Sequence, residues 1–143
     1  MQASQAVGSG TARAFVRWAD PAIPAGCNIT SVNVTLTYVA ADNTNQRTIF
    51  IEQFGAAGFT EGTVWNNQPG VDPPPFQSFV VPISASGSQA VSFNIGSAPY
   101  WFSPWVRGIR LRDSTDTGSG VISFITRDSA NVNERPRLVV TYA

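Results

Sequence analysis

The sequence predicts an all-β fold, namely a single antiparallel β-sandwich of the jelly-roll type with about eight strands and little or no helix. Apolar residues recur with a period of two rather than the helical period, and clusters of Gly, Pro, Asn and Asp separate the alternating segments. A chain of 143 residues with 43% hydrophobic residues is large enough to bury one core. We therefore expect one domain over residues 1–143.

The clearest strand candidate is Ser31–Ala40, where Val32, Val34, Leu36 and Tyr38 share one face and polar residues occupy the other. This alternation is typical of an antiparallel strand with one side on the core. Seven further segments between turn clusters have the composition of strands: Ala12–Trp18, Arg47–Phe54, Gln77–Ile83, Ala90–Ile95, Val106–Arg112, Val121–Arg127 and Arg137–Ala143.

Prolines indicate where we expect irregular segments. We expect the Pro73–Pro75 step to be a stiff connector inside a loop. The one helix candidate, residues 97–106, is interrupted by Pro99 and Pro104 and is more typical of an irregular turn. Turn-forming residues concentrate at Ala41–Gln46, Asn66–Pro75, Ser84–Gln89 and Asp113–Gly120.

The composition excludes several classes of enzyme. All nine basic residues are arginine, because the chain contains neither lysine nor histidine. Histidine-based nucleophile systems, histidine-ligated metal sites, P-loops and Schiff-base lysines are therefore excluded. A glycosidase needs two carboxylates at a fixed separation, but nothing in the sequence brings Glu52 and Glu61 together. We expect no enzymatic activity and no resident cofactor.

The charge distribution argues against a nucleic-acid partner. The formal net charge is zero, whereas binding to a phosphate backbone usually requires a basic excess. Residues 1–106 hold three arginines and five acidic residues, and residues 107–143 hold six arginines and four acidic residues. The neutral total therefore combines a net charge of −2 with one of +2.

No segment of the sequence predicts insertion into a membrane. The chain has no run of 18 apolar residues, and its first ten residues lack the basic and apolar regions of a signal peptide. Either the sequence starts after a removed signal or the protein reaches its place by another route. We expect an extracellular location or a place on the surface of a particle such as a virion. Cys27 has no partner for an internal disulfide, so we expect a small, buried or half-buried side chain there.

Several motifs go beyond these general patterns. Two are TEGTVWNNQP at residues 60–69 and ERPRLVVTY at residues 134–142, and the others are AFVRW at 14–18, IPAGCNITS at 23–31 and ISFITRD at 122–128. Together they resemble the DNRLRE domain over roughly residues 7–143. That family includes carbohydrate-binding modules of the disaggregatase-related type. The resemblance implies a non-catalytic jelly-roll module of secreted enzymes and surface proteins, able to bind polysaccharide.

The chain departs from the family pattern in two places. Family members carry another strand before the position of Val7, and we expect this strand to be missing here, since only six residues precede Val7. The stretch Ile95–Phe102 stands where relatives have a short helix and a tryptophan. The first departure raises the possibility that a neighbouring subunit supplies the missing edge strand.

Candidate contact residues for a glycan or a partner come from aromatic and arginine clusters. Residues 100–102 are consecutive aromatics, and they cannot all point inward from one extended strand. The alternatives are that the aromatics close the end of the sandwich and that the arginines form ion pairs or stack on rings. The candidates are Tyr100, Trp101 and Trp105, the arginines Arg110 and Arg112 on one strand face, and the amides Asn66 and Asn67.

Other residues of the motifs are expected to have structural roles. We expect Glu61 to cap backbone N–H groups or to pair with Arg135 or Arg137, and Trp65 to be part of the same architecture. Asp113 and Asp116 are weak candidates for a calcium site, although DSTDTGSG is also typical of a solvated hairpin loop.

Two functions remain open at this point. One is a non-catalytic surface module that binds glycan, with adhesion as its role. The other is a structural building block of a larger particle, such as a capsid decoration protein, a tail protein or a filament subunit. The expected partners are a polysaccharide or identical or neighbouring subunits, and a homo-oligomer is possible.

Overall fold

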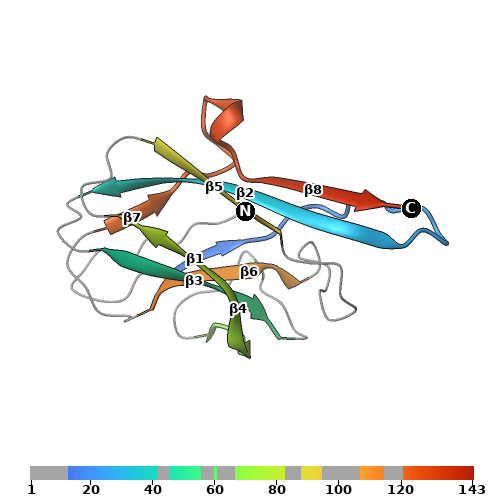
Figure 1. Ribbon diagram of the computed structural model, residues 1–143, viewed down its shortest axis with the longest axis horizontal. Helices are drawn as coiled ribbons and strands as arrows, with labels where there is room; N and C mark the ends of the chain where they lie inside the picture. The colour runs from blue at the N-terminus through green and yellow to red at the C-terminus, as the bar shows by residue number, and fades with distance from the viewer. Residues whose placement is uncertain are drawn as a thin grey trace.

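The computed structural model describes residues 13–41, 46–55, 60, 67–82, 88–94, 107–114 and 121–143. Within these residues, eight strands form two antiparallel sheets that pack against each other, which confirms the predicted all-β sandwich (Figure 1). Each predicted strand segment overlaps one observed strand. The strands are β1 (Arg13–Val16), β2 (Ile29–Ala41), β3 (Arg47–Phe54), β4 (Val71–Val81), β5 (Ser88–Asn94), β6 (Ile109–Asp113), β7 (Val121–Phe124) and β8 (Arg137–Tyr142).

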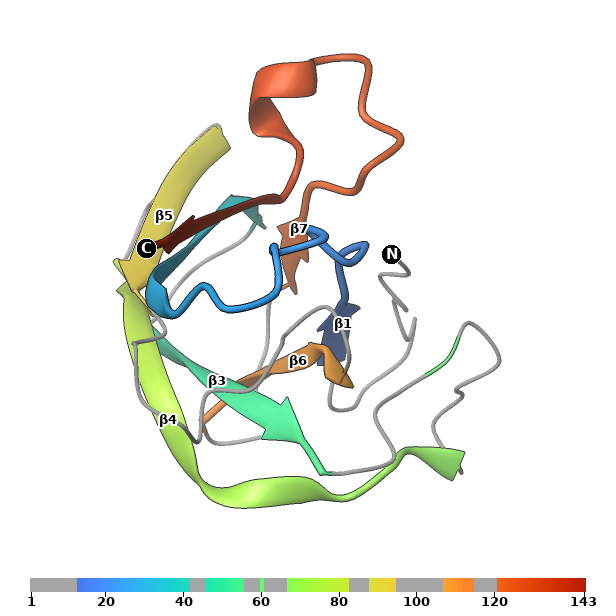
Figure 2. The same ribbon diagram turned by 90° about the vertical axis from the view of Figure 1, so that its right-hand side faces the viewer.

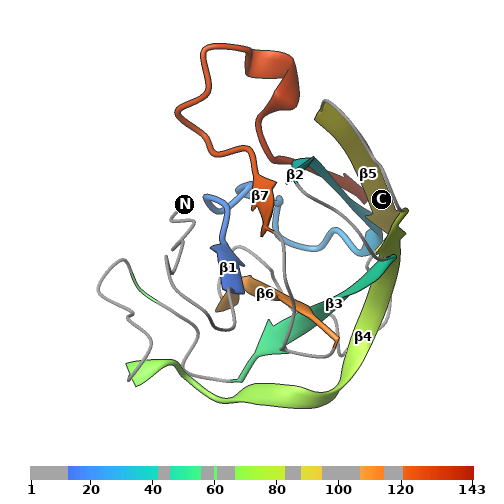
Figure 3. The same ribbon diagram turned by 90° about the vertical axis from the view of Figure 1, so that its left-hand side faces the viewer.

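The two sheets differ in width. Sheet A has the order β1-β6-β3-β4. In sheet B the long strand β2 lies in the centre, with β5 along one side and both β7 and β8 along the other. β7 pairs with residues 38–41 of β2 and β8 with residues 29–35, so these two strands follow one another along a single edge. Sheet B is therefore three strands wide in the described residues, whereas sheet A is four (Figures 2 and 3).

The core lies between the sheets and follows the predicted alternation. In β2, Val32, Val34, Leu36 and Tyr38 are all buried, as expected. They pack with Ile49, Ile51, Val81, Ile109 and Leu111 of sheet A and with Phe93 of β5. At about 25 cal/mol per Å² of buried apolar surface, this cluster is the main favourable contribution to folding.

The prediction of a loop at Pro73–Pro75 is wrong. These prolines lie within β4, whose observed start at Val71 falls inside the predicted turn cluster. The register of β4 with β3 shifts there, because Ile51 opposes Gln77 while Gln53 opposes Asp72. Residues 73–76 therefore have no partner on β3. Proline lacks the N–H that a ladder requires, and an edge strand with a bulge tolerates it.

The predicted end of β7 at Arg127 is also wrong, since the strand stops at Phe124. Beyond it, the N–H of Ser129 donates to the carbonyl oxygen of Thr126, and the N–H of Asp128 donates to the Thr126 hydroxyl oxygen, at 3.3 and 3.4 Å. Local bonds of this kind compete with the ladder. The N–H of Ile125 still donates to the carbonyl oxygen of Thr37 in β2, over 2.9 Å. The rest of residues 125–136 forms a loop that contains the 3-10 turn η2 (Val132–Glu134) and stands away from the sheets (Figure 1). We call it the projecting loop.

The connection from β1 to β2 includes a turn that depends on glycine. The N–H of Cys27 donates to the carbonyl oxygen of Pro24 over 3.2 Å, and Gly26 has a φ of 88°. A positive φ at this position of a turn favours glycine. Cys27 is half-buried, which agrees with the role expected for it.

Candidate binding surfaces

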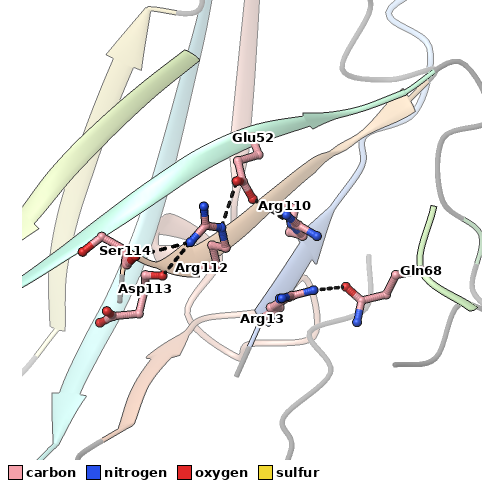
Figure 4. Close-up of polar contacts among 7 residues, drawn as sticks. All are labelled: Arg13, Glu52, Gln68, Arg110, Arg112, Asp113 and Ser114. Atoms are coloured by element: carbon pink, nitrogen blue, oxygen red, sulfur yellow. Dashed lines mark hydrogen bonds and ion pairs between the residues drawn. The ribbon is translucent and has the colours of Figure 1, made fainter. Parts of the chain in front are cut away.

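The outer face of sheet A carries a buried arginine–glutamate cluster. Alternation places Glu52 of β3 on the face opposite the core residue Ile51, and only 3% of Glu52 is exposed. Nη2 of Arg110 lies 2.7 Å from one carboxylate oxygen of Glu52, and Nε of Arg112 lies 2.8 Å from the other (Figure 4). One carboxylate thus receives charge-assisted bonds from two neighbouring positions of β6.

Further contacts fix the guanidinium of Arg112. Its Cζ lies 5.0 Å from the centroid of the Phe50 ring, within the range of a cation–π contact. Its Nη1 donates to the carbonyl oxygens of Asp113 and Ser114 at 3.2 and 3.5 Å. The geometry therefore favours the alternative prediction for these arginines. Arg110 and Arg112 both form ion pairs with Glu52, and Arg112 also stacks on the Phe50 ring. Because both guanidinium groups are largely buried and paired with Glu52, this geometry gives no support to a glycan contact by either arginine.

Apolar residues continue this buried layer on the same side of sheet A. The rings of Phe15 and Phe54 meet edge to face, with centroids 5.3 Å apart, and Val71 packs against them. Near them, Nη1 of Arg13 donates to Oε1 of Gln68 over 2.9 Å (Figure 4). Phe15 and Phe54 are 4% and 0% exposed, so this outer face does not lie open to solvent.

The outer face of sheet B has the opposite character. Its described side chains are mostly small, exposed and neutral, and Arg137 is the only charged residue among them. The hydroxyl oxygens of Thr35 and Ser92 lie 2.8 Å apart across β2 and β5. The exposed residues of this face are Asn33, Ser88, Ala90, Ser92, Asn94, Ser123, Arg137, Val139 and Thr141.

Exposed apolar residues concentrate near the C-terminal strand. Among the described residues, four large apolar side chains are exposed, and three of them lie within residues 132–142. Val132 at the tip of the projecting loop is 62% exposed, and Val139 and Tyr142 of β8 are 47% and 46% exposed. Single exposed apolar residues are common, but their concentration near β8 makes this segment a candidate contact region.

The edges of the sheets are protected to different degrees. β4 carries three prolines on one edge of sheet A, and β1 on the other edge is only four residues long. Prolines and short strands both reduce pairing with foreign strands. β5 exposes no large apolar side chain in the described residues. β5 and β8 both lack proline, and within the described residues each pairs with β2 alone, so neither outer edge is protected in this way. Only β8 of the two also carries large exposed apolar side chains, those of Val139 and Tyr142.

The predicted structural motif is described only in part. Nε and Nη2 of Arg135 both donate to the carbonyl oxygen of Ser129, at 2.9 and 2.7 Å. In the described residues Arg135 therefore fixes the projecting loop, and its predicted pairing with Glu61 stays a prediction. Arg137 is exposed on β8, and its side chain forms no bond within the described residues. Glu61 and Trp65 lie outside the described residues.

Most of the predicted contact residues lie outside the described part of the chain. Asn67 is described and exposed. Tyr100, Trp101, Trp105 and Asn66 lie outside the described residues, as does the helix candidate at residues 97–106.

The weak calcium candidate is divided in the same way. The carboxylate of Asp113 pairs with Nε of Arg47, which would repel a cation there, and Asp116 lies outside the described residues. No group of three or more Asp, Glu or Cys side chains in the described part of the chain could hold a metal ion. Within that same part, no helix has the length and hydropathy needed to cross a membrane.

Sequence reasoning missed the central role of Glu52. The sequence places it between Phe50 and Phe54 on one strand face, which is a signal of burial. A buried carboxylate requires a cationic partner, and the pair Arg110 and Arg112 on one face of another strand could supply it. The pairing of β3 with β6 was not visible in the sequence, and it brings these three residues together.

No protein-family model, curated protein or solved structure matches this chain. The likeness to the DNRLRE domain therefore rests on the sequence motifs and stays a prediction.

Proposed function

We propose that this chain is a non-catalytic structural module that joins neighbouring subunits of a larger assembly, such as a particle surface or a filament. The observation that carries the proposal is the outer edge of β8, which no strand of the described residues covers and which lies beside the exposed side chains of Val139 and Tyr142. An unpaired strand edge offers backbone donors and acceptors to another strand. The same edge fits the expectation that a neighbouring subunit contributes a strand to this sandwich.

Two further features support contact through the C-terminal segment. The projecting loop is fixed by the bonds of Arg135 to Ser129, and the side chain of Asn131 accepts from the N–H of Asn133 at 3.2 Å. A loop that is already ordered loses little conformational entropy when it binds. The outer face of sheet B beside it carries a single charge in the described residues, so a partner there need not desolvate a cluster of charges.

Analytical ultracentrifugation over a concentration series tests the proposal. We expect the wild-type chain to self-associate or to bind its natural neighbour subunit, and Val139→Lys to weaken that association by about tenfold or more, since a lysine on an edge strand opposes pairing. Val80→Lys is the matched control, because Val80 is exposed to a similar extent, 50%, on the proline-containing strand β4. Equal effects of the two lysines, or no association with itself or with a neighbour, would contradict the proposal.

Glycan binding with a role in adhesion is the second candidate. Its support is the sequence, where Trp101 and Trp105 belong to an aromatic cluster and the resemblance implies polysaccharide binding. The test is affinity electrophoresis in gels that contain neutral or acidic polysaccharides, with Trp101→Ala and Trp105→Ala as variants. Retardation that both variants abolish would favour this candidate over assembly.

A further inference from the structure

The backbone of β8 has a defined set of groups that point away from β2. The N–H of Asn28 donates to the carbonyl oxygen of Ala143, and the N–H of Ala143 donates to that of Asn28, at 2.7 and 2.9 Å. Ala143 therefore directs both of its backbone groups toward β2. Since the direction alternates along a strand, Thr141, Val139 and Arg137 do the same, whereas Tyr142, Val140 and Leu138 direct theirs to the outer edge.

This alternation is continuous along β8. The single irregularity in its pairing with β2 lies between Ile29 and Ser31, where the extra residue belongs to β2. The outer edge of β8 thus presents three consecutive sets of donors and acceptors. Pro136, which has no N–H to offer, comes just before the strand.

We propose that β8 pairs antiparallel with β8 of a second copy of this chain, with Val140 opposite Val140 across a two-fold axis. A two-fold axis perpendicular to a sheet pairs residues that point to the same face. The pairing centred on Val140 joins Leu138 with Tyr142 and uses every outward group of the strand, giving about six hydrogen bonds. The neighbouring arrangement, centred on Val139, places Tyr142 opposite Pro136 and loses donors.

β8 of a second copy is a better partner for this edge than β5 or β4 of that copy. β8 contains one charged residue, Arg137, and the pairing places it opposite Ala143, so no like charges meet. Val139 then lies opposite Thr141, and Tyr142 receives an apolar partner in Leu138. The described strand β5 offers Val139 only small or polar neighbours, and β4 carries the prolines. This inference specifies the partner within the assembly role proposed above and rests on it.

Cysteine cross-linking tests the register. In a Cys27→Ser background, Val139→Cys and Thr141→Cys chains are mixed and oxidised, and each variant is also oxidised alone. Both side chains are exposed, so the variants keep the fold. We expect the mixture to form disulfide-linked dimers about tenfold faster than either variant alone, because directly opposite residues are closer than diagonal ones. Equal or faster cross-linking of Val139→Cys alone would overturn the proposed register.

Amide hydrogen exchange at low and high protein concentration gives an independent measurement. The N–H groups of Leu138, Val140 and Tyr142 should gain protection at high concentration, whereas those of Arg137, Val139 and Thr141 should be protected at both. Association in the ultracentrifuge without this gain and without cross-linking would overturn the β8 pairing and leave the assembly role intact. A chain that associates with nothing would overturn both.

Discussion

The outer faces of the two sheets differ in burial and in charge. On sheet A the outer face is a second buried layer, with Glu52 held by two arginines and Phe54 fully buried. On sheet B the outer face is exposed, and its described residues carry one charge, at Arg137. The comparison teaches that the arginines of β6 belong to the architecture of sheet A, while the surface available to a partner lies on sheet B and its C-terminal edge.

The largest expected effect lies in the apolar part of the sheet A layer. Phe54→Ala removes a ring that is 0% exposed and leaves a cavity beside Phe15, so we expect a loss of about 3–5 kcal/mol in the free energy of unfolding. Val80→Ala, at a half-exposed position on β4, should change it by less than about 0.5 kcal/mol. Urea denaturation measures both. Similar values for the two variants would show that the outer face of sheet A is not a true core layer.

The ionic part of the layer gives the next effect. Glu52→Gln leaves two arginines facing each other without a carboxylate, and we expect a loss of about 3 kcal/mol. The matched control is Asp128→Asn, since Asp128 pairs with Arg127 at 3.5 Å but its side chain is 79% exposed. Exposed pairs contribute little, so the control should stay within about 0.5 kcal/mol. Thermal and urea denaturation compare the two, and a Glu52→Gln loss below that of the control would contradict a structural role for the cluster.

The smallest expected effect on stability is local and lies in the projecting loop, which connects β7 and β8 of sheet B. Arg135→Ala removes both bonds to the carbonyl oxygen of Ser129 and should cost about 1 kcal/mol, mainly by loosening the projecting loop. Limited proteolysis with thermolysin, which can cleave next to Val132, should become faster while the global unfolding midpoint changes little. Arg137→Ala, which removes an exposed arginine on β8, should leave the cleavage rate unchanged. A cleavage rate equal to that of wild type in Arg135→Ala would show that these bonds do not order the loop.

Much of the fold could be predicted from the sequence because the relevant physics is local. Alternation in residues 31–40 determined which side chains of β2 face the core, and turn residues separated the strands. The path of β4 through Pro73–Pro75 could not be predicted, because proline is compatible with a strand only where its neighbour leaves the ladder open. That condition depends on a register shift with β3.

The candidate surfaces were less accessible to sequence reasoning. The shared face of Arg110 and Arg112 followed from their spacing, but the choice between a ligand and an ion pair depended on Glu52, far away in the chain. The pairing of β3 with β6 brings Glu52 next to both arginines, and this pairing decides that they form ion pairs. The exposed edge of β8 was likewise not predictable, since only the pairing of both β7 and β8 with one side of β2 reveals it.

The central position of β2 has a consequence for how the protein is made. Val34 of β2 pairs with Phe93 of β5 on one side and with Leu138 of β8 on the other, so its partners emerge from the ribosome long after it does. Until then, the backbone edges of the longest strand lack these partners, and pairing between distant segments is slow. The period between the synthesis of β2 and that of β8 is therefore when the nascent chain is most prone to aggregation and most in need of a chaperone.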